Sequence, residues 1–238
     1  MSGLWLWLAC QVGRVSELEA QLSELQATHD SLLVERDTLH KKIDICRGDP
    51  TEIEAAAVDL HEAVIHAHQQ WDMEAARESL AQLREFYPNT NAGRVIERLT
   101  PALDVIGEAA PPLDNVTWLN TPGAYGELTV VYFLEEWCPF CRDELPQYTE
   151  KAAEFKERGV QVIGLTEISR TSTLEKLNAL LEETGTRFPV GQVADRTLHD
   201  AYNVEGIPAA AVVVDGTIVW RGGARQLNWE RIEQQRTQ

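Results

Sequence analysis

The sequence predicts an α/β domain in the second half of the chain, preceded by an all-α region. Residues 14–47 place apolar side chains at heptad spacing, which is typical of a coiled coil. Residues 128–134 and 160–165 are continuous apolar runs typical of buried strands, and each precedes a helical pattern. Asp215-Gly216 lies between two further apolar runs and indicates a β-hairpin. Strands that alternate with helices and end in a hairpin favour a mixed, helix-covered sheet.

Length and charge restrict the classes of protein. The 238 residues fit one globular domain with appendages. With 21 Lys and Arg against 38 Asp and Glu, the net charge is −17. Such a charge repels phosphate backbones and anionic headgroups, so no nucleic-acid partner is expected. Four cysteines are too few for a disulfide-stapled scaffold of this length.

The first 13 residues contain the apolar run Leu4–Ala9 followed by Cys10. The run is shorter than the roughly 20 residues that span a bilayer. It resembles the end of a bacterial lipoprotein signal peptide, which makes Cys10 a candidate for lipidation and membrane anchoring. No Lys or Arg precedes the run, and Trp7 stands where leucine is usual. The alternative is an apolar N-terminal tail.

Residues 14–47 are predicted to form a coiled coil. With Val15 at position a, the seam comprises Leu22 and Ile43 at a, and Leu18, Leu25, Leu32 and Leu39 at d. His29 and Arg36 occupy the remaining a positions and can fix the register. The alternative is a single amphipathic helix that packs on its own chain. In a parallel homodimer Cys46, at d, would face its twin; an interchain disulfide is one hypothesis, and a buried free thiol is the preferred one.

Residues 51–107 are predicted to be helical. Gly48-Asp49-Pro50 ends the first helix, and Thr51 with Glu54 is typical of a capping box. Three helices are expected, at 51–70, 73–86 and 92–106. The middle one, with its alanines and a closing Pro88-Asn89, resembles the second helix of a tetratricopeptide repeat. A single unit cannot form a repeat array, so the prediction is a helical hairpin that docks or acts as a spacer.

Histidines in this region do not indicate a metal site. His61, His66 and His68 lack the spacing of a ligand set and are expected at the surface. A linker is predicted at 107–112, where Pro111 and Pro112 stiffen the chain. The domain at 111–238 then begins with an edge strand at 116–119, and helices are expected at 173–183 and 228–235.

Two cysteines lie at a predicted strand-to-helix turn. Cys138 and Cys141 follow the strand at 128–134 and begin a helix that runs to about Phe155. The positive end of the helix dipole favours a thiolate there, so Cys138 is the expected nucleophile, and Cys141 can close a disulfide with it. A zinc site would need two more ligands, and Cys10 and Cys46 are isolated. No metal is expected.

The run from Trp137 to Arg142, Trp-Cys-Pro-Phe-Cys-Arg, together with Glu144 and Pro146, resembles the signature of thioredoxin-like proteins of the TlpA type. The resemblance extends from about Pro111 to the C-terminus and implies a thioredoxin fold. Gly206-Ile207-Pro208 is similar to the cis-proline loop of these proteins, and proline makes a cis bond affordable at about 0.5–1 kcal/mol.

The resemblance also implies roles for single residues. Trp137 and Pro208 would shape the docking surface, and the Ile207 backbone would pair with the substrate chain. For Trp137, as for Phe140 between the cysteines, plain apolar packing is the alternative. Many thioredoxins carry a buried acid six residues before the first cysteine, where this chain has Tyr132. Glu144 is then the candidate for taking the proton of Cys141; the alternative is a solvated helix residue.

We therefore expect a thiol–disulfide oxidoreductase, more specifically a reductant, in the bacterial cell envelope on the periplasmic side, with a cytoplasmic location as the alternative. Its partners would be protein thiols and disulfides, and a thiol protein that donates electrons. No organic cofactor is required. Chemistry with peroxide uses a lone cysteine in related folds, and DsbA-like oxidases carry a helical insertion that this sequence lacks between Leu165 and Pro208. The competing hypothesis is a coiled-coil scaffold whose thioredoxin-like domain serves for docking.

Overall fold

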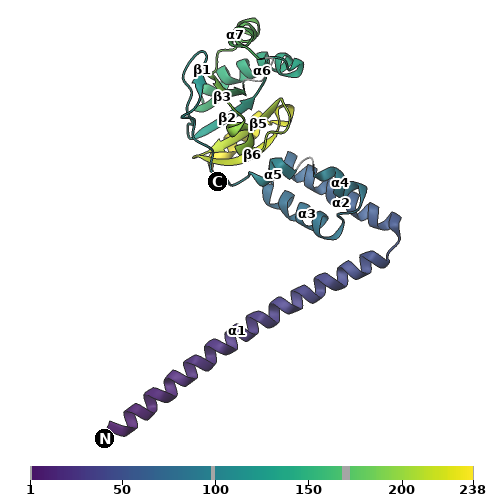
Figure 1. Cartoon of the computed structure of the whole chain (residues 1–238), viewed down its shortest axis with the longest axis vertical. Coiled ribbons are helices and arrows are strands. Elements are labelled where there is room, and N and C mark those ends of the chain that lie inside the picture. Colours follow the sequence, from purple (N-terminus) through teal and green to yellow (C-terminus); the bar gives the residue numbers. More distant parts are fainter. Residues whose placement is uncertain (1, 98–99, 168–171, 238) are drawn as a thin grey trace.

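The computed structural model describes the backbone of residues 2–97, 100–167 and 172–237, and the side chains of residues 14–97, 100–167 and 172–235. A long helix extends away from a helical unit, which packs on an α/β domain (Figure 1). The helices of the first half are α1 (Ser2–Arg47), α2 (Pro50–Gln69), α3 (Met73–Phe86), α4 (Asn91–Ile96) and α5 (Thr100–Asp104). We call α2–α5 the helical unit.

The seam of α1 is uncovered. The apolar side chains at positions a and d, Val15, Leu18, Leu22, Leu25, Leu32, Leu39 and Ile43, are between 45% and 66% exposed. The alternative of a single amphipathic helix that packs on its own chain is therefore wrong for most of α1, because only its end meets α3, where Lys42 pairs with Glu85 at 3.2 Å. Cys46 is an exposed free thiol in the single chain, and its burial in a coiled-coil dimer stays a prediction. The side chain of Cys10, the candidate lipidation site, lies outside the described residues. Among the described residues no helix is long and apolar enough to cross a membrane.

Two local expectations for the helical unit are wrong. The helix expected at 92–106 is divided into α4 and α5; Pro101, which has no N–H to continue a helix from α4, lies in the first turn of α5. Glu54 does not form a capping box with Thr51. Asp49 caps α2 through a 2.8 Å bond from Thr51 N, and Glu54 instead accepts bonds from the backbone N–H groups of Asn91 and Ala92 at the start of α4. A local motif was thus replaced by a contact between helices.

The α/β domain has a six-stranded mixed sheet in the order β1-β4-β3-β2-β5-β6. The strands are β1 (Thr117–Trp118), β2 (Leu128–Phe133), β3 (Val160–Glu167), β4 (Val190–Val193), β5 (Ala209–Val214) and β6 (Thr217–Gly223). The helices are α6 (Pro139–Lys156), α7 (Leu174–Glu183), α8 (Thr197–Ala201) and α9 (Trp229–Ile232), with 3₁₀ turns η1 (Ala224–Gln226) and η2 (Glu233–Thr237). Strand β2 pairs in parallel with β3 and antiparallel with β5, and all six of its residues are buried. Apolar clusters fill both faces of the sheet, one beneath α6 and α9 and one beneath α8. This is a thioredoxin fold, as the resemblance implied.

Most elements of this domain agree with their predictions. The edge strand, the central strands, α7 and the hairpin at Asp215-Gly216 are confirmed. The expected terminal helix is shorter, and it passes into η2 after Ile232. Strand β4 and helix α8 were not anticipated. The predicted linker is no free spacer, because Gly107 N donates to Ile218 O at 2.7 Å and Ala110 N to Gly216 O at 2.8 Å. These bonds cover the edge of β6.

The helical unit is joined to β6 by an aromatic stack. His68 is 2% exposed rather than at the surface, and its Nε2 lies 2.7 Å from Arg221 O. The ring of Trp220 packs against His68 at 5.5 Å and against Trp71 at 5.3 Å between centroids. A Cβ added at Gly222 would lie 2.7 Å from the Trp220 ring and 3.0 Å from the His68 ring, so glycine permits this approach.

Candidate active site

Cys138 and Cys141 form a disulfide at the start of α6, with Cα atoms 5.3 Å apart. Cys138 is the N-cap residue, and its sulfur accepts a bond from Cys141 N at 3.1 Å. Pro139 occupies the first turn, where no N–H is needed. The Cys138 sulfur therefore faces the unpaired N–H end of a helix, the environment that favours a thiolate once the disulfide is reduced.

The cis-proline loop lies beside this helix. The Ile207–Pro208 bond is cis, as the sequence predicts, and Pro208 O accepts a bond from Ala224 N at 3.2 Å. A hollow of about 220 Å³, here called the redox hollow, separates the two elements. It is lined by Phe140, Glu144, Pro208, Gly223, Ala224 and Arg225. Trp137 and Phe140 are each 55% exposed, so plain apolar packing is excluded for both, and they are available to a docking partner.

Glu144 is buried rather than solvated. Its side chain is 7% exposed, and Oε1 accepts a 2.6 Å bond from Arg225 Nε, whose guanidinium lies 5.2 Å from the centre of the Phe140 ring. Oε2 has no hydrogen-bond partner among the described residues. Burial raises the pKa of the Glu144 carboxyl, and the charge and hydrogen bond of Arg225 oppose that rise. The sequence offered Glu144 through the resemblance, but its partner Arg225 was missed, since it lies 81 residues away along the chain.

Tyr132 does not replace the missing acid. Its hydroxyl lies 3.5 Å from Cys141 O, at the limit of a hydrogen bond, and its ring stacks on Tyr148 at 4.1 Å between centroids. Burial raises the pKa of Tyr132, so the phenol stays neutral near pH 7. Tyr132 therefore packs beneath the cysteine pair and supplies no base.

Sequence reasoning also missed Glu135, which directly precedes the active-site turn. The side chain is 2% exposed; Oε1 accepts from Glu167 N at 2.8 Å and Oε2 from Thr166 Oγ1 at 3.2 Å. The carbonyl of Glu135 accepts the backbone N–H of Cys138 at 3.1 Å. The neighbouring Glu136 accepts a 2.7 Å bond from Ser172. The only signal in the sequence is two adjacent acids after a buried strand, which alone would be taken for a solvated turn.

Glu135 makes stability depend on pH. Burial raises the pKa of Glu135 to about 7 from 4.5, against its two hydrogen bonds, and the carboxylates of Glu167 and Glu136 add to the rise. Between these values the folded state binds more protons than the unfolded state, so the free energy of unfolding falls as pH rises. The free energy of unfolding should fall by about 1–3 kcal/mol less between pH 5 and pH 8 in Glu135→Gln than in the wild type. Urea denaturation at both pH values measures the difference.

The matched control for this prediction is Glu154→Gln. Glu154 is held by Lys151 and Arg158, whose interactions lower its pKa, so it stays ionised over the range tested. Its variant should keep the pH dependence of the wild type. If the free energy of unfolding changed equally with pH in Glu135→Gln and in the wild type, Glu135 would not titrate in this range.

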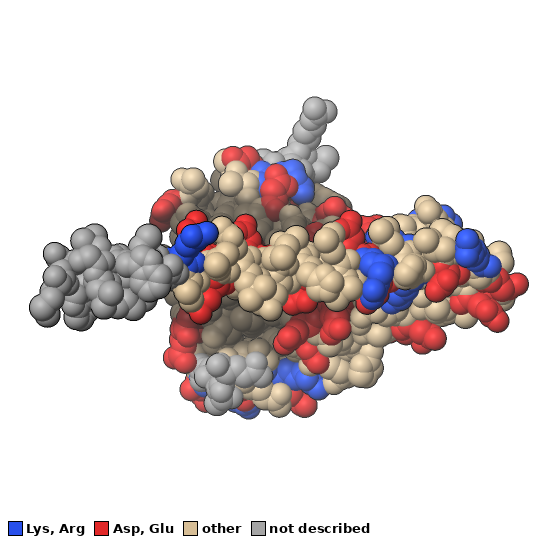
Figure 2. Space-filling model, turned by 90° about the horizontal axis from the view of Figure 1, so that it is seen from below, with Lys and Arg blue, Asp and Glu red and all other residues tan. Residues whose placement is uncertain are grey.

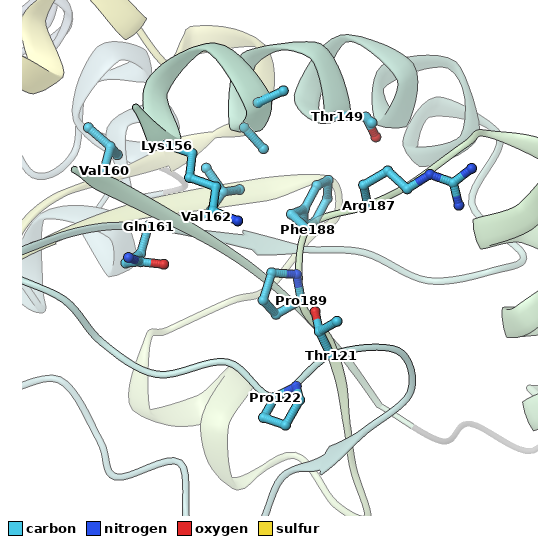
Figure 3. Close-up of a pocket in the computed structure, with 12 residues that line it drawn as sticks. Thr121, Pro122, Thr149, Lys156, Val160, Gln161, Val162, Arg187, Phe188 and Pro189 are labelled. Atoms are coloured by element: carbon cyan, nitrogen blue, oxygen red, sulfur yellow. The ribbon is translucent and has the colours of Figure 1, made fainter. Parts of the chain in front are cut away.

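A larger hollow, of about 420 Å³, lies away from the cysteine pair (Figure 3). Phe188, Val160 and Val162 form its apolar wall, with Lys156 and Arg187 at its rim. These residues come from the last turn of α6, the start of β3 and the segment before β4, whereas Cys138 follows the end of β2. Because β2 and β3 are parallel, the two sites lie at opposite ends of the sheet. Within the described part of the chain, no group of three or more His, Cys, Asp or Glu side chains could hold a metal ion.

The thioredoxin-like half of the chain is similar to known proteins. Residues 114–221 match the family model described as AhpC/TSA family. A thiol-disulfide oxidoreductase ResA from Oceanobacillus iheyensis is 26% identical over 111 residues, which cover 43% of this chain and 56% of that protein. The ResA of Bacillus subtilis is 25% identical over 88 residues, which cover 37% of this chain and 48% of that protein. The chain thus spans about half the length of the curated relatives it matches.

Solved structures with lower sequence identity match over a larger part of this chain. A secreted Mycobacterium tuberculosis disulfide oxidoreductase is 21% identical, with a TM-score of 0.38 over 47% of this chain and 81% of that one. The thioredoxin domain of a Bacteroides vulgatus thiol-disulfide oxidoreductase is 19% identical, with a TM-score of 0.43 over 54% of this chain and 96% of that one. Residues 114–221 are thus similar to the AhpC/TSA family and to curated thiol-disulfide oxidoreductases, which supports an oxidoreductase.

Proposed function

We propose that this protein is a thiol–disulfide oxidoreductase that reduces protein disulfides through Cys138 and Cys141. The observation that carries the proposal is the Cys138–Cys141 disulfide at the N-terminus of α6, beside the redox hollow that also contains cis-Pro208. In that hollow the exposed Phe140 and the nearby Trp137 offer apolar contact to a partner, and the Ile207 backbone can pair with an extended chain.

The reaction needs no group other than thiols. The Cys138 thiolate attacks one sulfur of the substrate disulfide, that bond breaks, and the released substrate thiolate takes a proton. The Cys141 thiolate then attacks the Cys138 sulfur and releases the second substrate thiol. The substrate gains two electrons, and the cysteine pair is left as the disulfide. A second thiol protein must return the pair to its reduced form.

Glu144 is proposed to accept the proton of Cys141 as that thiol becomes a nucleophile. Its unpartnered Oε2 is an available acceptor. Burial raises the pKa of the Glu144 carboxyl towards neutral pH, and a group whose pKa is close to the working pH transfers protons efficiently. Arg225 holds the other oxygen and limits the rise. If Glu144 has this role, Glu144→Gln will slow the resolving step, seen as accumulated mixed disulfide, without slowing the first attack by Cys138.

The proposed location is the bacterial cell envelope. Support comes from the resemblance of Leu4–Cys10 to the end of a lipoprotein signal peptide. Lipidation predicts that radiolabelled palmitate is incorporated into the wild type but not into Cys10→Ser. Equal labelling of the two would contradict it.

The reduction potential of the pair tests the proposed function. It is measured by equilibrium titration against thiol buffers, in a chain in which Cys10 and Cys46 are replaced by serine. A value near the thioredoxin range of about −270 mV is expected for a reductant, whereas one near about −120 mV would make the protein a disulfide donor. Failure to form a reversible disulfide would leave the scaffold hypothesis in its place.

We also propose that α1 forms a parallel coiled-coil homodimer. Its a and d side chains are exposed in the single chain, and Figure 2 shows uncharged surface between the acidic and basic groups. Leu25, at d, is 66% exposed, and Leu25→Asp should raise the dimer Kd at least about 100-fold, because two buried leucines are lost per dimer. Sedimentation equilibrium measures the change.

Val34→Asp is the matched control for the dimer, since Val34 is 68% exposed and lies outside positions a and d. It should leave the Kd unchanged. A monomeric wild type would overturn the proposal. On an oxidising, non-reducing gel, a dimer band lost in Cys46→Ser would place the two Cys46 thiols opposite each other, and a band at monomer mass would count against that pairing.

A further inference from the structure

The redox hollow is lined by residues of the α/β domain, two of which belong to η1. A second hollow of about 260 Å³, here called the lateral groove, is lined by the third residue of η1, Gln226, and by residues of the helical unit. It is lined by His61, Ile65, His68, Gln69, Val95, Ile96 and Gln226. Six of these seven residues belong to α2 and α4, so the groove lies between the helical unit and the turn that follows β6.

Gln226 connects the two hollows. It lines the lateral groove, and its Oε1 accepts a 3.0 Å bond from the backbone N–H of Gly223, which lines the redox hollow. Arg225, the neighbour of Gln226, lines the redox hollow as well. Both hollows therefore have η1 in their walls.

The helical unit is held in a fixed place beside this wall. His68, at the end of α2, bonds Arg221 O, and the Trp71 ring stacks on Trp220; these two residues of β6 lie three and four positions before η1. From the other side, Arg231 of α9 donates to Gln70. Figure 1 shows β6 on the side of the sheet that faces the helical unit. A fixed helical unit can take part in recognition, whereas a flexible spacer cannot.

We propose that the lateral groove is the second half of the substrate-binding surface, and that it takes an apolar side chain of the extended segment next to the substrate disulfide. This inference rests on the proposed function. The lining residues suggest the ligand: Ile65 and Val95 offer carbon surface above the buried Ile96, and Gln69 and Gln226 can bond a peptide backbone. Val95 is 50% exposed, so its surface has no cover in the single chain.

Two disulfides of different size test the proposal. Insulin presents a disulfide within polypeptide, whereas 5,5′-dithiobis(2-nitrobenzoate) can reach Cys138 alone. With the full reduced chain, Val95→Glu should lower kcat/KM for insulin about five- to tenfold, mainly through KM, because a carboxylate must lose water to let an apolar side chain enter. The rate with the small disulfide should stay within about a factor of two. Gln69→Glu, on α2, should act in the same direction.

Val34→Glu is the matched control, since it places the same charge on an exposed valine of α1. It should change neither rate. Insulin kinetics unchanged by both groove variants would overturn the inference while leaving the proposed function intact. Equal losses for both substrates would also overturn it, because they would indicate damage to the redox centre. A reduced wild type that reacts with neither disulfide would instead overturn the proposed function.

Discussion

Replacing Cys138 by serine is expected to abolish disulfide exchange with any substrate. A hydroxyl in the N-cap position still accepts the Cys141 N–H, as the sulfur does at 3.1 Å, so the fold of α6 should be kept. The nucleophilic thiolate is lost, and the remaining Cys141 is the more buried of the two thiols, 0% exposed against 3% for Cys138. The rate of 2-nitro-5-thiobenzoate release from the small disulfide, followed by absorbance, should fall to that of buffer.

Two companion variants make this result specific. Cys46→Ser removes an exposed thiol far from the pair and should keep full exchange with insulin. Cys141→Ser keeps the nucleophile but lacks the resolving thiol, so it should accumulate a mixed disulfide that mass spectrometry detects. If Cys138→Ser also loses α1-mediated assembly in sedimentation, the residue is structural and the assignment of a nucleophile fails.

Trp220→Ala is expected to give the largest loss of stability, about 3–5 kcal/mol. The side chain is fully buried in β6 and lies between the sheet core and the rings of His68 and Trp71. Truncation leaves a cavity at the junction between the α/β domain and the helical unit, so both lose packing. Urea denaturation monitored by circular dichroism measures the free energy of unfolding.

Trp137→Ala is the matched control, because Trp137 is 55% exposed. Removing it should change the free energy of unfolding by no more than about 0.5 kcal/mol. Similar losses of unfolding free energy for the two variants would mean that Trp137 and Trp220 are not buried to different degrees in solution. A small loss for Trp220→Ala would show that the helical unit does not pack on β6.

Patterns local in the sequence predicted much of the fold. The apolar run at 128–134, the cysteines at a strand-to-helix turn and the hairpin at Asp215-Gly216 are all found where expected. The cis bond before Pro208 is also present. Each of these depends on the chemistry of a few neighbouring residues, such as the fixed φ of proline or the left-handed backbone at a type I′ turn.

Failures of prediction occurred where a residue's partner is distant in the sequence. Glu54 has the spacing of a capping box yet bonds α4, and His68, expected at the surface, bonds β6 across 153 residues. Glu144 could be proposed from its place in the signature, but its burial and its bond to Arg225 depend on how the turn after β6 returns to α6. Glu135 could not be distinguished from a solvated acid.

The sequence by itself thus determined the elements, the redox pair and the fold class, because periodicity, turn chemistry and the cysteine spacing are local properties. Only the tertiary structure decided which acids are buried beside the active site, that the expected linker pairs with β6, and that the helical unit lies against the turn after β6. Burial and hydrogen bonding between distant segments arise from the packing of whole elements, so no window of sequence contains them.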